Sequence, residues 1–127
     1  PIFAGAAGRV LLSQIEEERA KEVIQKKGLV RYTSKTVVDQ RQFLREVENV
    51  KEKGYATDDE EYIAGVRAVA APLFFASSGP AALWVVGFTS TMDNQKMKTV
   101  IREIRETTQE IKQSTERIGI RAKGPLG

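Results

Sequence analysis

The strongest constraint on the fold is a long apolar stripe near the C-terminus. Apolar or small residues recur there at spacings of three and four, at Met97, Val100, Ile101, Ile104, Thr108, Ile111, Thr115 and Ile118. This period is typical of one face of an amphipathic α-helix. We therefore expect a helix over about residues 93–118, followed by a frayed tail at 123–127. The stripe could form a dimer seam, but for most of its length we favour packing across the sheet of its own domain.

Two apolar segments before this helix predict a β-hairpin. Residues 66–75 and 81–89 are strongly apolar, and residues 77–80 between them have the composition of a turn. Pro72 lacks a backbone donor, so the first strand should lie at a sheet edge or end there. A further short strand is expected at residues 55–57.

The N-terminal half predicts helices. Residues 4–14 indicate a tight turn that leads into a short buried helix, and residues 16–27 run from acids to lysines before Gly28, as helices often do. Residues 29–38 show no clean pattern and are expected to be irregular or briefly extended. A third helix should begin at Asp39, with Gln42 in a capping-box position, and end at Gly54.

This order of elements predicts an α+β domain, an antiparallel sheet flanked by helices. A length of 127 residues suits one such domain. Three strands are few for three or four helices, so we expect the parent protein to supply further strands before Pro1.

Composition excludes several kinds of chemistry. The chain has no cysteine and no histidine, which rules out Cys/His zinc sites, cysteine nucleophiles and histidine-based triads. The net charge of +3, from 20 basic and 17 acidic residues, is too small for a dense nucleic-acid-binding surface. No apolar run is long enough to span a membrane. We expect a cytoplasmic protein that is not an enzyme, needs no cofactor and does not contact membranes.

Three stretches resemble the IclR-type bacterial transcriptional regulators. The most specific is GYATDDEE at residues 54–61 followed by GVRAVAAPLF at residues 65–74. It is similar to the family signature of Gly-Tyr, a doublet of acids ending in glutamate, Gly-x-Arg and an Ala-Ala-Pro strand. Weaker matches are PIFA at residues 1–4 with AGRVLL at 7–12, and residues 28–36. Together they cover nearly the whole chain in the family's order.

The resemblance implies the effector-binding domain of a repressor or activator, with a GAF-like or profilin-like fold. Residues 1–120 would form this domain without its first strands, and residues 121–127 a tail. A winged helix-turn-helix outside this chain would bind promoter DNA. The partners implied are a small organic effector and further copies of the chain, as a homodimer or homotetramer. The alternative function is a purely structural oligomerisation module without a ligand.

The resemblance also implies where the effector binds. The pieces of the family pocket map to Ala6 and Ala7 in the small-residue turn, to Asp58, to Ala68 after Gly-x-Arg, and to Trp84 and Val86 on the last strand. Relatives that bind small keto acids tend to have serine at the last two positions and often cysteine at the position of Ala68. Tryptophan, valine and alanine favour an apolar or aromatic effector instead.

Several of these residues also have an interpretation that needs no ligand. Asp58 could form a polar pocket wall or cap a helix start. We expect Glu60 and Glu61 to face solvent. Trp84 could simply be core, and residues 4–8 could pack closely rather than offer N–H groups to an anion. The acidic run supplies too few converging oxygens for a cation, so no metal site is expected.

Overall fold

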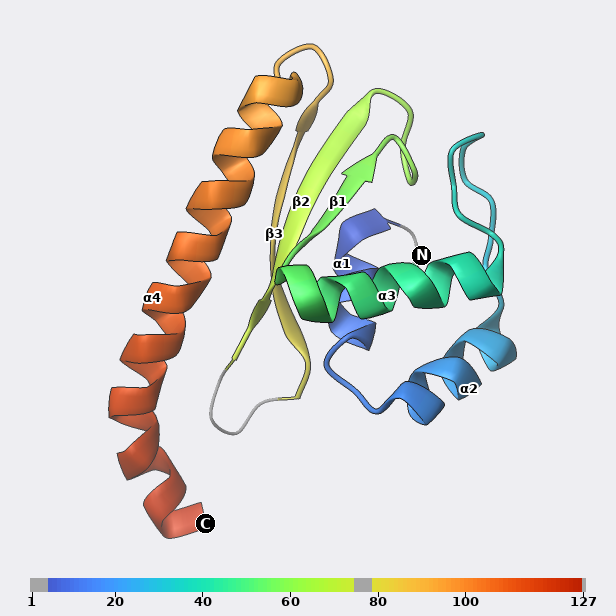
Figure 1. Cartoon of the computed structure of the whole chain (residues 1–127). Coiled ribbons are helices and arrows are strands. Elements are labelled where there is room, and N and C mark those ends of the chain that lie inside the picture. The colour runs from blue at the N-terminus through green and yellow to red at the C-terminus, as the bar shows by residue number, and fades with distance from the viewer. Residues whose placement is uncertain (1–4, 75–78, 127) are drawn as a thin grey trace.

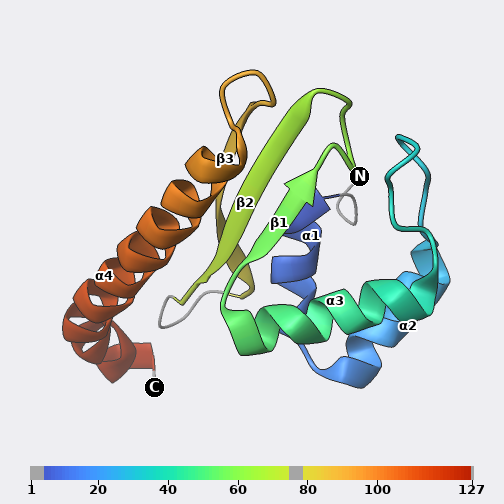
Figure 2. The ribbon, with the colours of Figure 1, turned by 45° about the horizontal axis from the view of Figure 1, so that its top comes forward.

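A three-stranded antiparallel sheet forms the middle layer of the computed structural model, which describes residues 5–74 and 79–126. The described elements are α1 (Gly5–Leu12), α2 (Glu17–Lys27), α3 (Gln40–Lys53), β1 (Ala56–Asp59), β2 (Val66–Leu73), β3 (Ala81–Phe88) and α4 (Asn94–Leu126). The helices α1, α2 and α3 lie on one side of the sheet and α4 on the other (Figures 1 and 2). The predicted α+β class, with helices flanking an antiparallel sheet, is confirmed.

The register of the strands decides which side chains share a face. The strand order is β1-β2-β3, and Ala70 of β2 pairs with Ala56 of β1 and Trp84 of β3. The next β2 residue towards the N-terminus, Val69, pairs with Thr57 and Val85. Successive side chains along a strand point to opposite faces. One face therefore carries Ala56, Ala70 and Trp84, and the other carries Thr57, Val69 and Val85.

Small side chains allow α1 to lie close to the first of these faces. Ala6 and Val10 of α1 form a buried cluster with Val50 of α3, Ala56 and Ala70. An alanine surface lets the helix backbone approach the sheet more closely than larger side chains would. We call this the α1 face.

The opposite face is covered by α4. Ile104 packs against the buried Val69 and Ala71, with the partly buried Met97, Val100 and Ile101 around them. The predicted packing of the apolar stripe across the sheet of its own domain is confirmed for the part of α4 that runs from Met97 to Ile104. The predicted end at Ile118 is wrong: the helix continues to Leu126, past the hairpin end of the sheet, and includes most of the expected tail (Figure 1).

A second cluster joins α2 to α3. Phe43 and Val47 of α3 pack with Leu12, Ala20 and Ile24. The start of α3 at Asp39 is as predicted, since the Asp39 carboxylate accepts a hydrogen bond from the Gln42 backbone N–H at 2.8 Å. Only half of the expected capping box forms, because the Gln42 side chain donates to Glu46. Gly54 ends the helix in the left-handed conformation.

Pro72 fits one of its two predicted positions, near the end of its strand, but not the other. β2 is the central strand of the described sheet, so its placement at an edge is wrong, although it ends one residue later at Leu73. Pairing with β1 stops at Ala70, so beside Pro72 only β3 is hydrogen-bonded to β2. A proline without a backbone donor is tolerated where the strand has one neighbour.

The bounds of β1 also differ from the prediction. β1 runs over Ala56–Asp59, further into the acidic run than the predicted 55–57. Part of the predicted turn, together with Phe75, lies outside the described residues. Within the described residues, no helix is both long and apolar enough to cross a membrane.

Replacing the buried Phe43 should cost far more stability than replacing an exposed phenylalanine. Phe43 is 1% exposed and Phe88 of β3 is 69% exposed. We expect Phe43→Ala to lower the free energy of unfolding by about 3–5 kcal/mol, because burial is lost and a cavity remains. Phe88→Ala is the matched control and should change it by about 0.5 kcal/mol or less. Urea unfolding measures both, and equal losses would contradict the core assignment.

Candidate functional site

Four of the predicted site residues lie together on the α1 face. Asp58, Ala68 and Val86 pair directly across β1, β2 and β3. Trp84 pairs with Ala70, in the next row on the same face. Side chains in directly paired positions lie about 4.5–5.5 Å apart at their β-carbons. The register therefore brings a carboxylate, an alanine, a valine and an indole into one contiguous patch.

The start of α1 lies against this patch. Gly5 has φ +76°, and a β-carbon at this position would clash with Oδ2 of Asp58. Only glycine meets both conditions without strain. Ala6 and Ala7 follow directly, so the first turn of α1 begins beside the Asp58 carboxylate. The N–H groups of a first helical turn have no acceptor within the helix and can serve an anion.

The patch has a buried part and an exposed part. Ala6, Asp58 and Ala68 are at most 4% exposed, whereas Trp84 and Val86 are 49% and 47% exposed. The interpretation of Trp84 as plain core does not fit a side chain that is half open to solvent. Ala6 belongs to the core cluster beneath α1, so any ligand contact there would be made by its backbone.

The acidic run is tied into the structure by Arg9. The Arg9 guanidinium donates to Glu61 Oε1 at 2.9 Å and Oε2 at 3.1 Å, and to the Thr57 carbonyl oxygen. Its Nε also lies 3.5 Å from Glu46 Oε1 of α3. The Arg9 side chain is 4% exposed and that of Glu61 14%. The expectation that Glu61 faces solvent is therefore wrong.

Glu60 also has partners within the domain. Its carboxylate accepts hydrogen bonds from the Gly65 N–H at 2.8 Å and from Lys35 Nζ at 3.0 Å. The Gly65 hydrogen bond, followed by the Lys35 bond, lowers the pKa of Glu60. The hydroxyl groups of Thr33 and Thr36 donate to the carbonyls of Glu60 and Glu61. The irregular segment before α3, which contains Thr33 and Thr36, thus holds the acidic loop around Glu60 and Glu61 in place.

Burial raises the pKa of Asp58 above the ordinary value of 3.8. The hydrogen bond from the Glu61 N–H to Asp58 Oδ1, at 2.7 Å, opposes this effect without cancelling it. Desolvation disfavours the ionised carboxylate, which has little contact with water. Asp58 is thus both a turn-forming acceptor and a carboxyl group whose charge is costly in the folded state. In the described part of the chain, no three acidic side chains group closely enough to hold a metal ion.

Comparison with known proteins identifies the family. The protein-family model described as "Bacterial transcriptional regulator IclR C-terminal" matches residues 1–113 of this chain. This chain belongs to the IclR family. It is 30% identical over 112 residues to the HTH-type transcriptional repressor AllR of Escherichia coli K12. That match covers 87% of this chain and 41% of AllR, so the chain spans less than half the length of that relative.

Solved structures of IclR-family domains share the fold. The inducer-binding domain of PobR from Acinetobacter, a double mutant in complex with 3-hydroxybenzoic acid, superposes with a TM-score of 0.81 at 33% identity, covering 88% of this chain and 65% of that one. The Thermotoga maritima IclR protein superposes with a TM-score of 0.80 at 26% identity, over 90% of this chain and 47% of that one. The GAF-like α+β prediction agrees with these IclR structures.

Sequence reasoning missed the Arg9–Glu61 pair. The two residues are far apart in the chain, and charged side chains on a helix and in an acidic loop usually face solvent. The one available signal was that Arg9 occupies an otherwise apolar helix, Gly5–Leu12. A cation on such a buried helix requires an acidic partner.

Asp58→Asn should change how stability depends on pH. Because the pKa of Asp58 is raised in the folded state, the folded protein binds the carboxyl proton more tightly than the unfolded chain does. The stability that the protonated carboxyl contributes is therefore lost as pH rises through the folded-state pKa. We expect the Asn variant to match the wild type below the ordinary pKa and to gain stability relative to it as pH rises. Urea unfolding from acid to neutral pH measures the difference, and a gap that does not change with pH would contradict the assignment.

Arg9→Met should destabilise the domain strongly. The substitution leaves the Glu61 carboxylate buried without its cation, which we expect to cost about 3–5 kcal/mol. Adding Glu61→Gln removes the unpaired carboxylate charge and should recover part of the lost free energy of unfolding. A double-mutant cycle by urea unfolding measures the coupling between the two residues. Strictly additive losses would show that the pair does not act as a unit.

Proposed function

We propose that this chain is the effector-sensing domain of a transcriptional regulator and that its effector is a small aromatic acid bound on the α1 face. The observation that carries the proposal is the row of Asp58, Ala68 and Val86 beside the half-exposed Trp84. An aromatic ring fits an indole and an aliphatic side chain better than a small polar acid does. Relatives that bind keto acids often have serine or cysteine at the positions of Ala68, Trp84 and Val86, and this chain lacks those hydroxyl and thiol groups.

A polar end of the effector would meet two different groups. The N–H groups at the start of α1 favour a carboxylate, and the Asp58 carboxyl can accept a hydrogen bond from a hydroxyl. The PobR domain, 33% identical to this chain, was solved with 3-hydroxybenzoic acid, which carries both groups on one ring. This supports an aromatic hydroxy acid as the first class of compound to test.

Regulation would follow from a shift between two arrangements of the protein. A ligand can move such an equilibrium only by binding one arrangement more tightly. In the proposed regulator, a homodimer or homotetramer in the cytoplasm, effector binding changes the spacing of winged helix-turn-helix domains on promoter DNA. Catalysis has no part in this proposal.

Thermal unfolding and the fluorescence of Trp84 test the proposal directly. Trp84 is the only tryptophan in the chain, so its emission reports on this patch. We expect 3-hydroxybenzoic acid or a related aromatic acid to change the emission and, at about 100 times its Kd, to stabilise the domain by about 2.7 kcal/mol. For a domain of this size this corresponds to a rise in Tm of several degrees.

Two variants make the result specific. Trp84→Ala should abolish the rise in Tm, whereas Phe74→Ala should keep it, since Phe74 is an equally exposed aromatic residue at the other end of the sheet. A panel of aromatic acids, aliphatic acids and sugar acids separates the ligand classes. If a cooperative transition is unmoved by every class, the effector proposal fails and the structural oligomerisation module gains support.

A further inference from the structure

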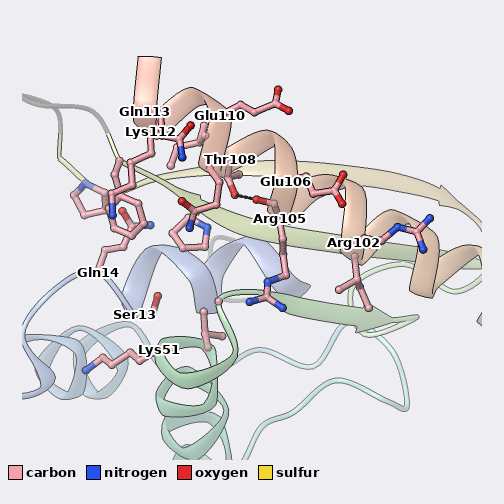
Figure 3. Close-up of a pocket in the computed structure, with 18 of the residues that line it drawn as sticks. Ser13, Gln14, Lys51, Arg102, Arg105, Glu106, Thr108, Glu110, Lys112 and Gln113 are labelled. Atoms are coloured by element: carbon pink, nitrogen blue, oxygen red, sulfur yellow. Dashed lines mark hydrogen bonds between the residues drawn. The ribbon is translucent and has the colours of Figure 1, made fainter. Parts of the chain in front are cut away.

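A large groove lies at the end of the sheet opposite the Asp58–Trp84 patch. It has a volume of about 1140 Å³ and runs between α4, the C-terminal ends of α1 and α3, and the hairpin end of β2 and β3 (Figure 3). It is lined by none of the predicted effector-site residues. Pockets for small ligands have about 300–1,000 Å³. The groove therefore exceeds what one small effector fills.

One row of cations forms the α4 wall of this groove. Lys98, Arg102, Arg105 and Lys112 all line it, and their spacings of four, three and seven residues place them along one side of the helix. Lys51 of α3 lines the groove as well. Five cations and two carboxylates thus line the groove. The net charge of these side chains, +3, equals the net charge of the whole chain.

Within the described residues, the four cations of α4 that line the groove have no acidic partner. In the described part of the chain, none of the four lies within 4.0 Å of a carboxylate, although eight such pairs occur elsewhere. Arg105 instead stacks over the ring of Tyr55 at 5.7 Å, and Lys112 over Phe74 at 5.2 Å. Figure 3 shows Arg105 pointing from α4 towards the end of α3.

The floor of the groove is largely apolar. Val50, Pro72, Leu73 and Phe74 line it beside the polar Ser13 and Gln14, and Phe74 is half exposed. A nucleic acid would require a broad basic surface with many phosphate contacts, and an apolar floor offers it nothing. A polypeptide with both acidic and apolar side chains matches the cationic wall and the floor together.

The dimensions of the groove favour an extended segment. Lys98 to Lys112 span about 21 Å along α4 at 1.5 Å per residue. An extended chain rises about 3.3 Å per residue, so about six residues would fill this length. Arginine side chains hold carboxylates in paired hydrogen bonds. We propose that this groove binds an extended acidic segment of a partner protein, independently of the effector.

Fluorescence anisotropy with a labelled hexapeptide tests the proposal on the whole 127-residue chain. The probe is Glu-Leu-Glu-Glu-Leu-Glu, and the same peptide with lysine in place of glutamate is the charge control. We expect the acidic probe alone to bind, and its binding to weaken as salt is raised, because exposed charges are screened. Trp84→Ala should leave its affinity unchanged, so this test is separate from the effector test.

A matched pair of variants locates the binding surface. Arg102→Glu/Arg105→Glu should weaken binding about tenfold or more, because two exposed attractions become repulsions. Lys96→Glu/Arg117→Glu makes the same change of charge at exposed positions of α4 that do not line the groove, and should change affinity less than about twofold. Circular dichroism confirms that both variants are folded.

The other outcomes would overturn the proposal. Equal losses in both variants would mean that only net charge attracts the peptide. Binding of inorganic phosphate or benzoate in the groove, without binding of the peptide, would make it a small-anion site. Self-association lost on Arg102→Glu/Arg105→Glu would make it an interface between copies of this chain. Failure of the acidic probe to bind at physiological salt would leave the groove without the proposed partner.

Discussion

The fold on the α1 side depends on one buried cation. The Arg9 guanidinium of α1 has to be paired, since a buried charge without partners would be prohibitively costly. Its partners come from β1, from the acidic loop and from α3. Meeting that requirement ties the helix to the edge strand β1 and helps to set the path of the acidic loop. Asp58, which pairs with Ala68 and accepts a hydrogen bond from the Glu61 N–H, lies next to this network.

Local signals in the sequence predicted most elements correctly. The period of three and four found α4, because one face of that helix is covered by the sheet. The Asp39 cap and Gly54 gave the ends of α3, because both depend on residues a few positions apart. Predictions failed where a distant residue decided the outcome. Glu61 is buried by Arg9, and Pro72 is tolerated because pairing with β1 stops at Ala70.

The candidate site was only partly accessible from the sequence. The resemblance to IclR proteins supplied the residues, but not their arrangement, because strand register depends on long-range pairing. The register aligns Asp58, Ala68 and Val86, and it brings Trp84 next to them. Its assignment as an effector site stays a prediction. The cationic groove had no signal in the sequence, since its arginines alternate with glutamates along α4 and resemble a solvated helix face.

The outer position of β3 has a consequence for handling this chain in solution. Among the described strands, β3 pairs only with β2, and its exposed residues Trp84, Val86 and Phe88 all lie on one face. An unpaired strand edge with apolar side chains is a template for β-pairing between molecules. Concentrated samples should therefore associate edge to edge and become prone to aggregation. Replacing Phe88, the most exposed of the three, by lysine would oppose this pairing between molecules.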